Sequence, residues 1–241
     1  MKSILPALAL FAGMLMPAHA ADSLAAFHKN DLILFQGDSI TDGGRMRTGN
    51  DYNHIMGQSY PYIIAAEVGA QYPERNLTFV NRGISGNTVV NLAARWQKDT
   101  LALKPQFLSI LIGVNDTHQV GGPEDLDTFQ RTYDKLLSDT IAALPGTKII
   151  LGEPFLLPVG GYKTNYDAKL AEVKKHAAVV AALAEKYHLP LVRFQKAFDE
   201  GCEKAPADHW SWDGVHPTYA GHGLMVQAWL DAVNRAWPSS P

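Results

Sequence analysis

Short apolar runs recur along the chain and alternate with longer segments of helical periodicity. The five runs cover residues 32–35, 77–80, 107–112, 148–151 and 189–194. Their apolar residues are continuous and do not alternate with polar ones, which is typical of strands covered on both faces. We therefore expect five buried strands.

The segments between these runs place apolar side chains three to four residues apart, as amphipathic helices do. Helices are predicted at 60–71, 126–144, 167–187 and 219–237. Strands that alternate with helices over the whole length predict a parallel sheet with helices on both sides. The expected fold class is α/β, a three-layer α/β/α sandwich around a central five-stranded parallel sheet.

Two polar segments that follow predicted strands are expected to be long loops. Residues 41–59 include Arg45 and Tyr52, and residues 154–166 are rich in Pro and Gly. In an open α/β sheet, loops that leave the carboxyl ends of strands line the ligand crevice. Both loops are therefore candidates for shaping a substrate site, although a solvated loop explains their polar residues equally well.

The first 20 residues have the three-part pattern of a signal peptide. Lys2 precedes an apolar stretch at 4–16, and Ala18-His19-Ala20 has the small residues of a cleavage site. The apolar stretch is shorter than the roughly 20 residues that span a bilayer; a buried N-terminal helix is the alternative. We expect a cleaved signal peptide at 1–20, a single domain at 21–241, a periplasmic or secreted protein, and no stable membrane insertion.

Composition narrows the function classes. The chain is 46% hydrophobic and 19% charged, as ordinary globular proteins are, and its formal net charge is −3. No basic run is present, so nucleic acid is not an expected partner. Cys202 is the only cysteine, so no intrachain disulfide can form and the hydrophobic core must hold the fold alone.

Ser39 lies where the first apolar run meets a polar turn, in Gly37-Asp38-Ser39. A serine hydroxyl is a poor nucleophile until a base removes its proton. The tripeptide alone reads as a turn in which Asp caps and Gly supplies unusual dihedral angles. Its position at a strand end, where this fold class exposes a side chain, favours a nucleophile.

Asp213 and His216 are the candidate partners of this nucleophile, in Asp213-Gly214-Val215-His216-Pro217. An unperturbed imidazole titrates near neutrality and can carry the serine proton. A carboxylate three residues earlier can fold back to fix its tautomer. The alternative is a capped loop before the helix predicted at 219, which Gly214 and Pro217 fit well.

Acyl transfer also needs donors aimed at the developing oxyanion. The Gly86 backbone N–H follows the second apolar run, the Asn115 side-chain amide follows the third, and the Ser39 N–H is a third candidate. Taken singly, Gly86 reads as a left-handed turn and Asn115 as an Asx turn. The order of all these segments along the chain favours an oxyanion site.

Together these residues resemble the SGNH (GDSL-type) hydrolases. The four matching blocks are Gly37-Asp38-Ser39, with Ile40 in place of the usual leucine, residues 83–87, Gly113-Val114-Asn115-Asp116, and Asp213-Gly214-Val215-His216-Pro217. The resemblance implies a flavodoxin-like SGNH hydrolase fold. It implies Ser39 as nucleophile, His216 as base, Asp213 as its orienting carboxylate, and Ser39, Gly86 and Asn115 as the oxyanion hole.

A finer resemblance is to bacterial carbohydrate acetylesterases such as acetylxylan esterases, carried by residues 81–88, 94–96, 109–116 and 216–222. It implies a secreted serine esterase that removes O-acetyl groups from xylan or xylo-oligosaccharides. The alternatives are a lysophospholipase or thioesterase with the same residues, and a non-catalytic carbohydrate-binding protein on the same fold. The resemblance is compatible with assembly of the chain into a homo-oligomer.

Candidate substrate contacts lie beside these motifs: Asp38, Arg45, Tyr52, Trp210 and Trp212. Aromatic faces suit sugar rings, although tryptophans near a chain end also pack the last helix against a sheet. The sequence has no His-Glu-x-x-His, no cysteine pair and no acidic calcium loop, so no metal site is expected. No Gly-x-Gly-x-x-Gly follows the first strand, and we expect no cofactor.

Overall fold

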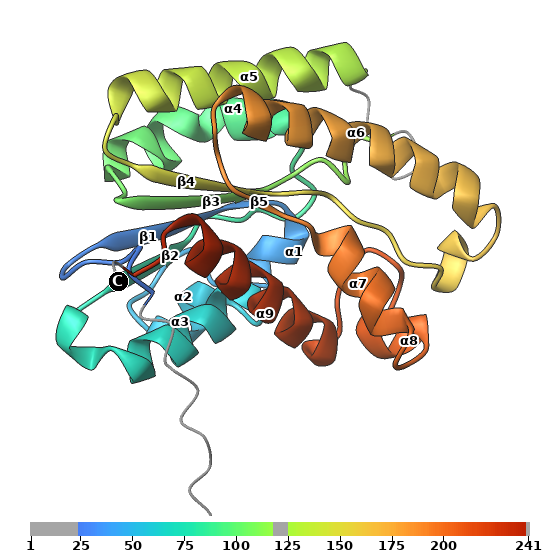
Figure 1. The fold of residues 1–241 in the computed structure, drawn as a ribbon, viewed down its shortest axis with the longest axis horizontal. Coiled ribbons are helices and arrows are strands. Elements are labelled where there is room, and N and C mark those ends of the chain that lie inside the picture. The colour runs from blue at the N-terminus through green and yellow to red at the C-terminus, as the bar shows by residue number, and fades with distance from the viewer. Residues whose placement is uncertain (1–23, 118–124, 240–241) are drawn as a thin grey trace, which may run out of the picture.

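The centre of the molecule is a five-stranded parallel sheet with strand order β2-β1-β3-β4-β5 (Figure 1). The computed structural model describes residues 24–117 and 125–239. The strands are β1 (Leu32–Gly37), β2 (Thr78–Asn81), β3 (Phe107–Leu111), β4 (Lys148–Gly152) and β5 (Leu191–Val192). The predicted parallel sheet is confirmed, and its strand order places β1 and β3 side by side at the centre.

Helices cover both faces of this sheet (Figure 1). One layer holds α4 (Val89–Asp99), α5 (Leu126–Ala143) and α6 (Tyr166–Lys186). The other holds α3 (Tyr60–Gln71), α7 (Phe194–Cys202) and α9 (Tyr219–Ala236), with the short helices α2 (Tyr52–Met56) and α8 (Ala207–Trp210). The three-layer α/β/α fold predicted from the sequence is therefore confirmed.

Two hydrophobic clusters, one on each side of the sheet, explain why the strands read as continuous apolar runs. All five residues of β3 are buried, and its successive side chains enter opposite clusters: Phe107 joins one and Leu108 the other. In the first cluster, Trp229 from α9 packs against Phe35 and Phe107, with ring centroids 5.7 and 5.5 Å apart. Burial on both faces removes the polar alternation that a half-exposed strand would show.

The structure adds short elements that periodicity did not indicate. Inside the expected loop at 41–59, Asp51 caps α2 by accepting from the Asn53 and His54 N–H groups. The expected strand at 189–194 is only two residues long, because α7 begins at Phe194. Single-turn 3₁₀ helices lie at Pro73–Arg75, Leu101–Leu103 and Gly160–Tyr162.

The predicted signal peptide at 1–20 lies outside the described residues, and the single domain at 21–241 stays a prediction. In the part of the chain that the structure describes, none of the helices has the length and apolar character needed to cross a bilayer.

Candidate active site

Ser39 is the first residue of the one-turn helix α1 (Ser39–Asp42), which begins directly after β1. Asp38 caps this helix, because its Oδ1 accepts from the Ile40 N–H at 2.9 Å. The turn from strand to helix is tight at Gly37, where any Cβ would collide with the Thr41 side chain and the Leu111 carbonyl. The local sequence thus presents Ser39 at the carboxyl edge of the sheet.

Asp38 itself is buried beneath this turn, with 1% of its surface exposed. Burial raises the pKa of its carboxyl from 3.8 to about 7, and the bond from the Ile40 N–H opposes that rise only in part. Its Oδ2 is buried and has no hydrogen-bond partner among the described residues. Its capping bond fixes the backbone around Ser39; as a substrate contact, Asp38 stays a prediction.

Ser39, His216 and Asp213 form a continuous hydrogen-bonded relay. Ser39 Oγ lies 2.8 Å from His216 Nε2, and His216 Nδ1 lies 2.6 Å from Asp213 Oδ2. Because Nδ1 faces a carboxylate, it carries the ring proton, which leaves Nε2 free to accept from the serine hydroxyl. This arrangement can remove the Ser39 proton as the oxygen attacks an electrophile.

Two opposing influences act on the Asp213 carboxyl. Burial raises its pKa, but hydrogen bonds outweigh burial and the net pKa is lowered. Its Oδ1 accepts from the backbone N–H groups of His216 at 2.7 Å and Val215 at 2.9 Å. The same short loop therefore holds Asp213 ionised and orients it toward the imidazole.

The loop from Ser211 to Pro217, which precedes α9, is held by hydrogen bonds between its own residues. Ser211 Oγ donates to the His216 carbonyl and accepts from the Gly214 N–H, at 2.8 and 2.9 Å. Gly214 has φ +104, which favours glycine, and its carbonyl accepts from the Leu157 N–H at 2.9 Å. The second long loop predicted from the sequence thus supports the acid–base pair.

The two predicted donor segments also lie together. Gly86, at φ +80, is exposed in the loop that follows β2, and no hydrogen bond within the described residues uses its N–H. Asn115 follows β3, and its Nδ2 donates to the Asn87 carbonyl at 3.1 Å. This bond joins the Asn115 amide to the residue that follows Gly86, so both candidate donors belong to one cluster.

The predicted aromatic contacts differ in exposure. Trp212 is 65% exposed and its ring stacks on His216, with centroids 5.2 Å apart and planes 16° apart. Trp210 is half-buried, and its Nε1 donates to the Ala205 carbonyl at 3.2 Å. Tyr52 is 84% exposed on α2. Trp212 is therefore the one of these three aromatic residues that packs directly against the proposed base.

Arg45 is buried, although it lies in a polar loop whose residues were expected to face solvent or substrate. Only 8% of it is exposed, and its Nε donates to the Gly83 carbonyl at 2.9 Å. Burial lowers the pKa of its guanidinium to about 10, with a smaller contribution from Arg47. Its contribution as a substrate contact stays a prediction.

His222 is a buried neighbour of the relay to which the sequence assigned no clear role. Burial, together with the nearby His216, lowers the pKa of its imidazole to about 4. Its Nδ1 accepts from the Tyr60 N–H at 3.2 Å, as a neutral ring does. At neutral pH the site thus contains a neutral histidine, His222, beside the relay.

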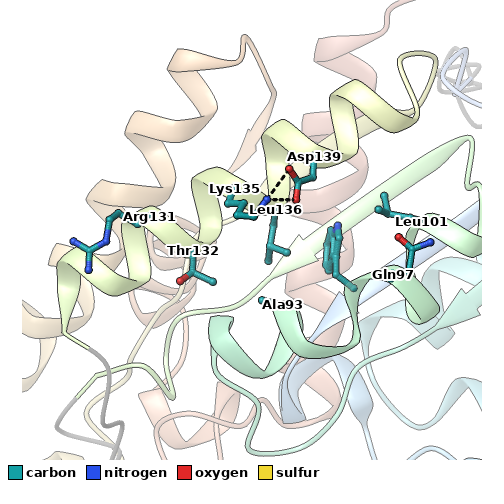
Figure 2. Close-up of a pocket in the computed structure, with 9 residues that line it drawn as sticks. Ala93, Gln97, Leu101, Arg131, Thr132, Lys135, Leu136 and Asp139 are labelled. Carbon is teal, nitrogen blue, oxygen red and sulfur yellow. Dashed lines mark hydrogen bonds and ion pairs between the residues drawn. The ribbon is translucent and has the colours of Figure 1, made fainter.

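No group of three or more His, Cys, Asp or Glu side chains that could hold a metal occurs among residues 24–117 and 125–239. A groove of about 390 Å³ lies elsewhere, between α4 and α5 (Figure 2). Its lining residues are Ala93, Trp96, Gln97, Leu101, Arg131, Thr132, Lys135, Leu136 and Asp139. None of them belongs to the relay or to the donor segments.

Comparison with known proteins decides the family. The family model for GDSL-like lipases and acylhydrolases matches residues 35–224. The chain belongs to this family. It is also 35% identical, over 216 residues, to an acetylxylan esterase from Geobacillus stearothermophilus, covering 86% of this chain and 96% of the relative. Membership in the family makes the chain a carboxylic ester hydrolase.

Solved structures of similar proteins agree with the fold. A GDSL-like protein from Parabacteroides merdae superposes with a TM-score of 0.81 at 38% identity, covering 86% of this chain and 97% of its own. The acetylxylan esterase Axe2 from Geobacillus stearothermophilus superposes with a TM-score of 0.77 at 33% identity, covering 90% of this chain and 100% of its own. LAE5, an alpha/beta hydrolase from the Lake Arreo metagenome, superposes with a TM-score of 0.79 at 31% identity, covering 89% of this chain and 100% of its own.

Proposed function

We propose that this esterase removes O-acetyl groups from xylan or xylo-oligosaccharides through an acyl-enzyme at Ser39, and that it acts after export. The observation that carries the proposal is the relay of 2.8 and 2.6 Å from Ser39 through His216 to Asp213. The similarity to an acetylxylan esterase over 86% of the chain supports the substrate class.

In the first half of the reaction, Ser39 Oγ bonds to the ester carbonyl carbon while His216 Nε2 takes the hydroxyl proton. Asp213 stabilises the resulting imidazolium and keeps its ring oriented. The carbonyl oxygen becomes an oxyanion, which accepts from the N–H groups of Ser39 and Gly86 and from the Asn115 amide. The bond to the sugar oxygen then breaks, and His216 returns the proton to that oxygen.

The second half repeats these steps with water. His216 removes a proton from a water molecule whose oxygen attacks the acetyl carbon on Ser39. The same donors stabilise the second oxyanion, and its collapse releases acetate while the proton returns to Ser39 Oγ. Each proton that His216 accepts is given back, so the enzyme is unchanged after one cycle.

The openness of the site supports a bulky alcohol as leaving group. The side chains of His216 and Asp213 are 34% and 29% exposed, so solvent reaches both partners of Ser39. Trp212 lies over the His216 ring and presents an exposed aromatic face beside the reacting atoms. A sugar ring has C–H-rich faces that pack on such a surface, and we propose Trp212 as its contact.

The direct test is the replacement Ser39→Ala, assayed by acetate release from acetylated xylo-oligosaccharides. Loss of the nucleophile is expected to reduce kcat at least about 10³-fold, since removing one member of such a unit removes most of its effect. Ser138→Ala is a matched control, because Ser138 is an exposed serine on α5 that donates only to the Lys135 carbonyl. Retention of more than a few per cent of activity by Ser39→Ala would contradict the mechanism.

A substrate panel separates the acetylesterase from a lysophospholipase or thioesterase built on the same residues. We expect acetyl esters of xylo-oligosaccharides to be hydrolysed with a higher kcat/KM than esters or thioesters of long acyl chains. A preference for acyl chains of about eight carbons or more would reject the acetyl substrate and keep the serine mechanism. Failure of an organophosphate to label Ser39 would instead favour a non-catalytic binding protein.

A further inference from the structure

Asp42, at the end of α1, is a buried carboxylate that contacts the loop carrying Gly86. It is 2% exposed and lies three residues after Ser39. Its Oδ2 accepts from the Ser85 N–H at 2.9 Å, the Ser85 hydroxyl at 2.6 Å and Arg47 Nη2 at 2.8 Å. One carboxylate oxygen thus links the nucleophile's helix to the residue immediately before Gly86.

The same loop is held a second time, at Gly83, by the segment that follows α1. Arg45 Nε and Arg47 Nη1 both donate to the Gly83 carbonyl, at 2.9 and 2.8 Å. A Cβ on Gly83 would collide with the Asp42 backbone nitrogen, so the loop lies directly against the helix. Two arginines and one aspartate therefore hold the 83–85 segment at a set distance from Ser39.

On its far side the loop is fixed by α4. Arg95 Nε donates to Asn87 Oδ1 at 2.9 Å, and Arg95 Nη1 donates to the Arg82 carbonyl at 2.9 Å. Gly86 itself has no heavy atom within 4 Å of the place where a Cβ would stand. The direction of its N–H is therefore set by its two neighbours, Ser85 and Asn87, and not by packing of its own.

We propose that Asp42 is a positioning residue for the oxyanion site: through Ser85 it holds the Gly86 N–H in place relative to Ser39. The inference rests on the proposed esterase mechanism, in which the Gly86 N–H is one of the donors. Electrostatic stabilisation of an oxyanion depends on donors that are fixed before the charge develops, so a loosened donor loses most of its value. Asp42 contacts no reacting atom and acts only through Ser85.

The charges around Asp42 suit this role. A buried carboxylate is costly unless it is paired and hydrogen-bonded. Arg47 bonds to its Oδ2, and Arg45 Nε lies 3.8 Å from its Oδ1. The arginines thus offset the buried negative charge, and the same guanidinium groups also hold the Gly83 carbonyl.

The test combines two variants: Asp42→Asn removes the charge that accepts from Ser85, and Ser85→Ala removes the 2.6 Å hydroxyl bond but keeps the bond from the Ser85 N–H. Variants are compared on an acetyl ester and on the matching thionoester, whose sulfur is a weaker hydrogen-bond acceptor and gains less from oxyanion donors. We expect kcat/KM for the oxygen ester to fall about tenfold and that for the thionoester to change much less. Because both rates scale with the amount of folded enzyme, their quotient does not respond to a purely structural defect.

Two further variants complete the design. Ser85→Thr keeps a hydroxyl and is expected to restore the quotient, and Ser138→Ala is expected to leave it unchanged. An equal fall on both esters, or no fall, in Asp42→Asn and in Ser85→Ala would overturn the role of Asp42. If Ser39→Ala still hydrolyses both esters, the esterase mechanism itself fails, which is a separate outcome.

Discussion

Charged side chains form two different kinds of cluster in this molecule. At the carboxyl edge of the sheet, Asp42 is 2% exposed and shares its hydrogen bonds with Ser85 and Arg47. In the groove between α4 and α5, Lys135 pairs with Asp139 at 2.8 Å, and their side chains are 73% and 46% exposed (Figure 2). The distances between the charged atoms are alike in the two clusters, but Asp42 is buried and the Lys135–Asp139 pair is exposed to solvent.

This difference decides what each cluster can do. Water competes for the exposed pair and screens it, so it adds little to stability. Fixed donors instead hold one oxygen of the buried Asp42 carboxylate, Oδ2, and those donors are the backbone and side chains that shape the site. Ionic groups at the sheet edge therefore fix the geometry of the site, whereas those on the helix surface remain in solvent.

The largest effect is expected where a carboxylate orients the relay, at Asp213. In Asp213→Asn the remaining oxygen can still accept from the backbone, but the new amide donates toward His216 Nδ1. The imidazole then carries its proton on Nε2 and cannot accept from Ser39, so kcat is expected to fall by about 10²–10⁴-fold. Steady-state hydrolysis of an acetyl ester measures the change, and a loss below tenfold would mean that Asp213 does not set the tautomer.

A smaller effect is expected at Asp38, whose buried carboxyl has a raised pKa of about 7. Between pH 4 and 7 the unfolded chain has lost this proton while the folded protein keeps it. The folded state therefore binds more protons, and its stability falls as pH rises through this window. Asp38→Asn removes this titrating group. The fall in the free energy of unfolding between pH 4 and 7 should therefore be smaller by a few kcal/mol, since each unit of pKa difference corresponds to about 1.4 kcal/mol.

Urea unfolding of both proteins at several values between pH 4 and 8 tests the Asp38 prediction. The free energy of unfolding of the variant, relative to the wild type, should increase steadily as the pH rises. Two parallel pH curves would show that Asp38 does not titrate in the folded protein within this range.

The smallest effect is expected for the exposed pair in the groove of Figure 2. Lys135→Ala removes its ion pair with Asp139 and should change the free energy of unfolding by no more than about 0.5 kcal/mol. Esterase activity should stay at the wild-type level. A loss of 2 kcal/mol or more would show that exposure is a poor guide to the strength of ion pairs here.

Much of the fold could be predicted from the sequence because its determinants are local. The helix expected at 60–71 is α3, and the helix expected at 219–237 differs from α9 by one residue. The short helix α2 was missed, because one turn gives too little periodicity and its start depends on the cap by Asp51. The end of β5 was misplaced because Phe194 is equally apolar whether it continues a strand or opens α7.

For the site, residues close to a motif were easier to interpret than residues that act across the fold. The spacing of Asp213 and His216 predicted the fold-back, and the structure places the Asp213 carboxylate 2.6 Å from the ring. The cluster around Asp42 could not be found in this way, since its partner Ser85 is 43 residues away. Arg45 was considered for a substrate rim because its loop is polar, but only the fold reveals that the side chain lies inside.

The end of α9 has a practical consequence for the use of this esterase. Trp237, which follows the helix, packs against Phe107 with ring centroids 5.3 Å apart. Phe107 opens β3, so the end of α9 lies at the amino edge of the sheet, opposite α1, whose first residue is Ser39 (Figure 1). A linker attached after Trp237 would anchor the enzyme to a solid support with Ser39, the proposed nucleophile, facing away from that support.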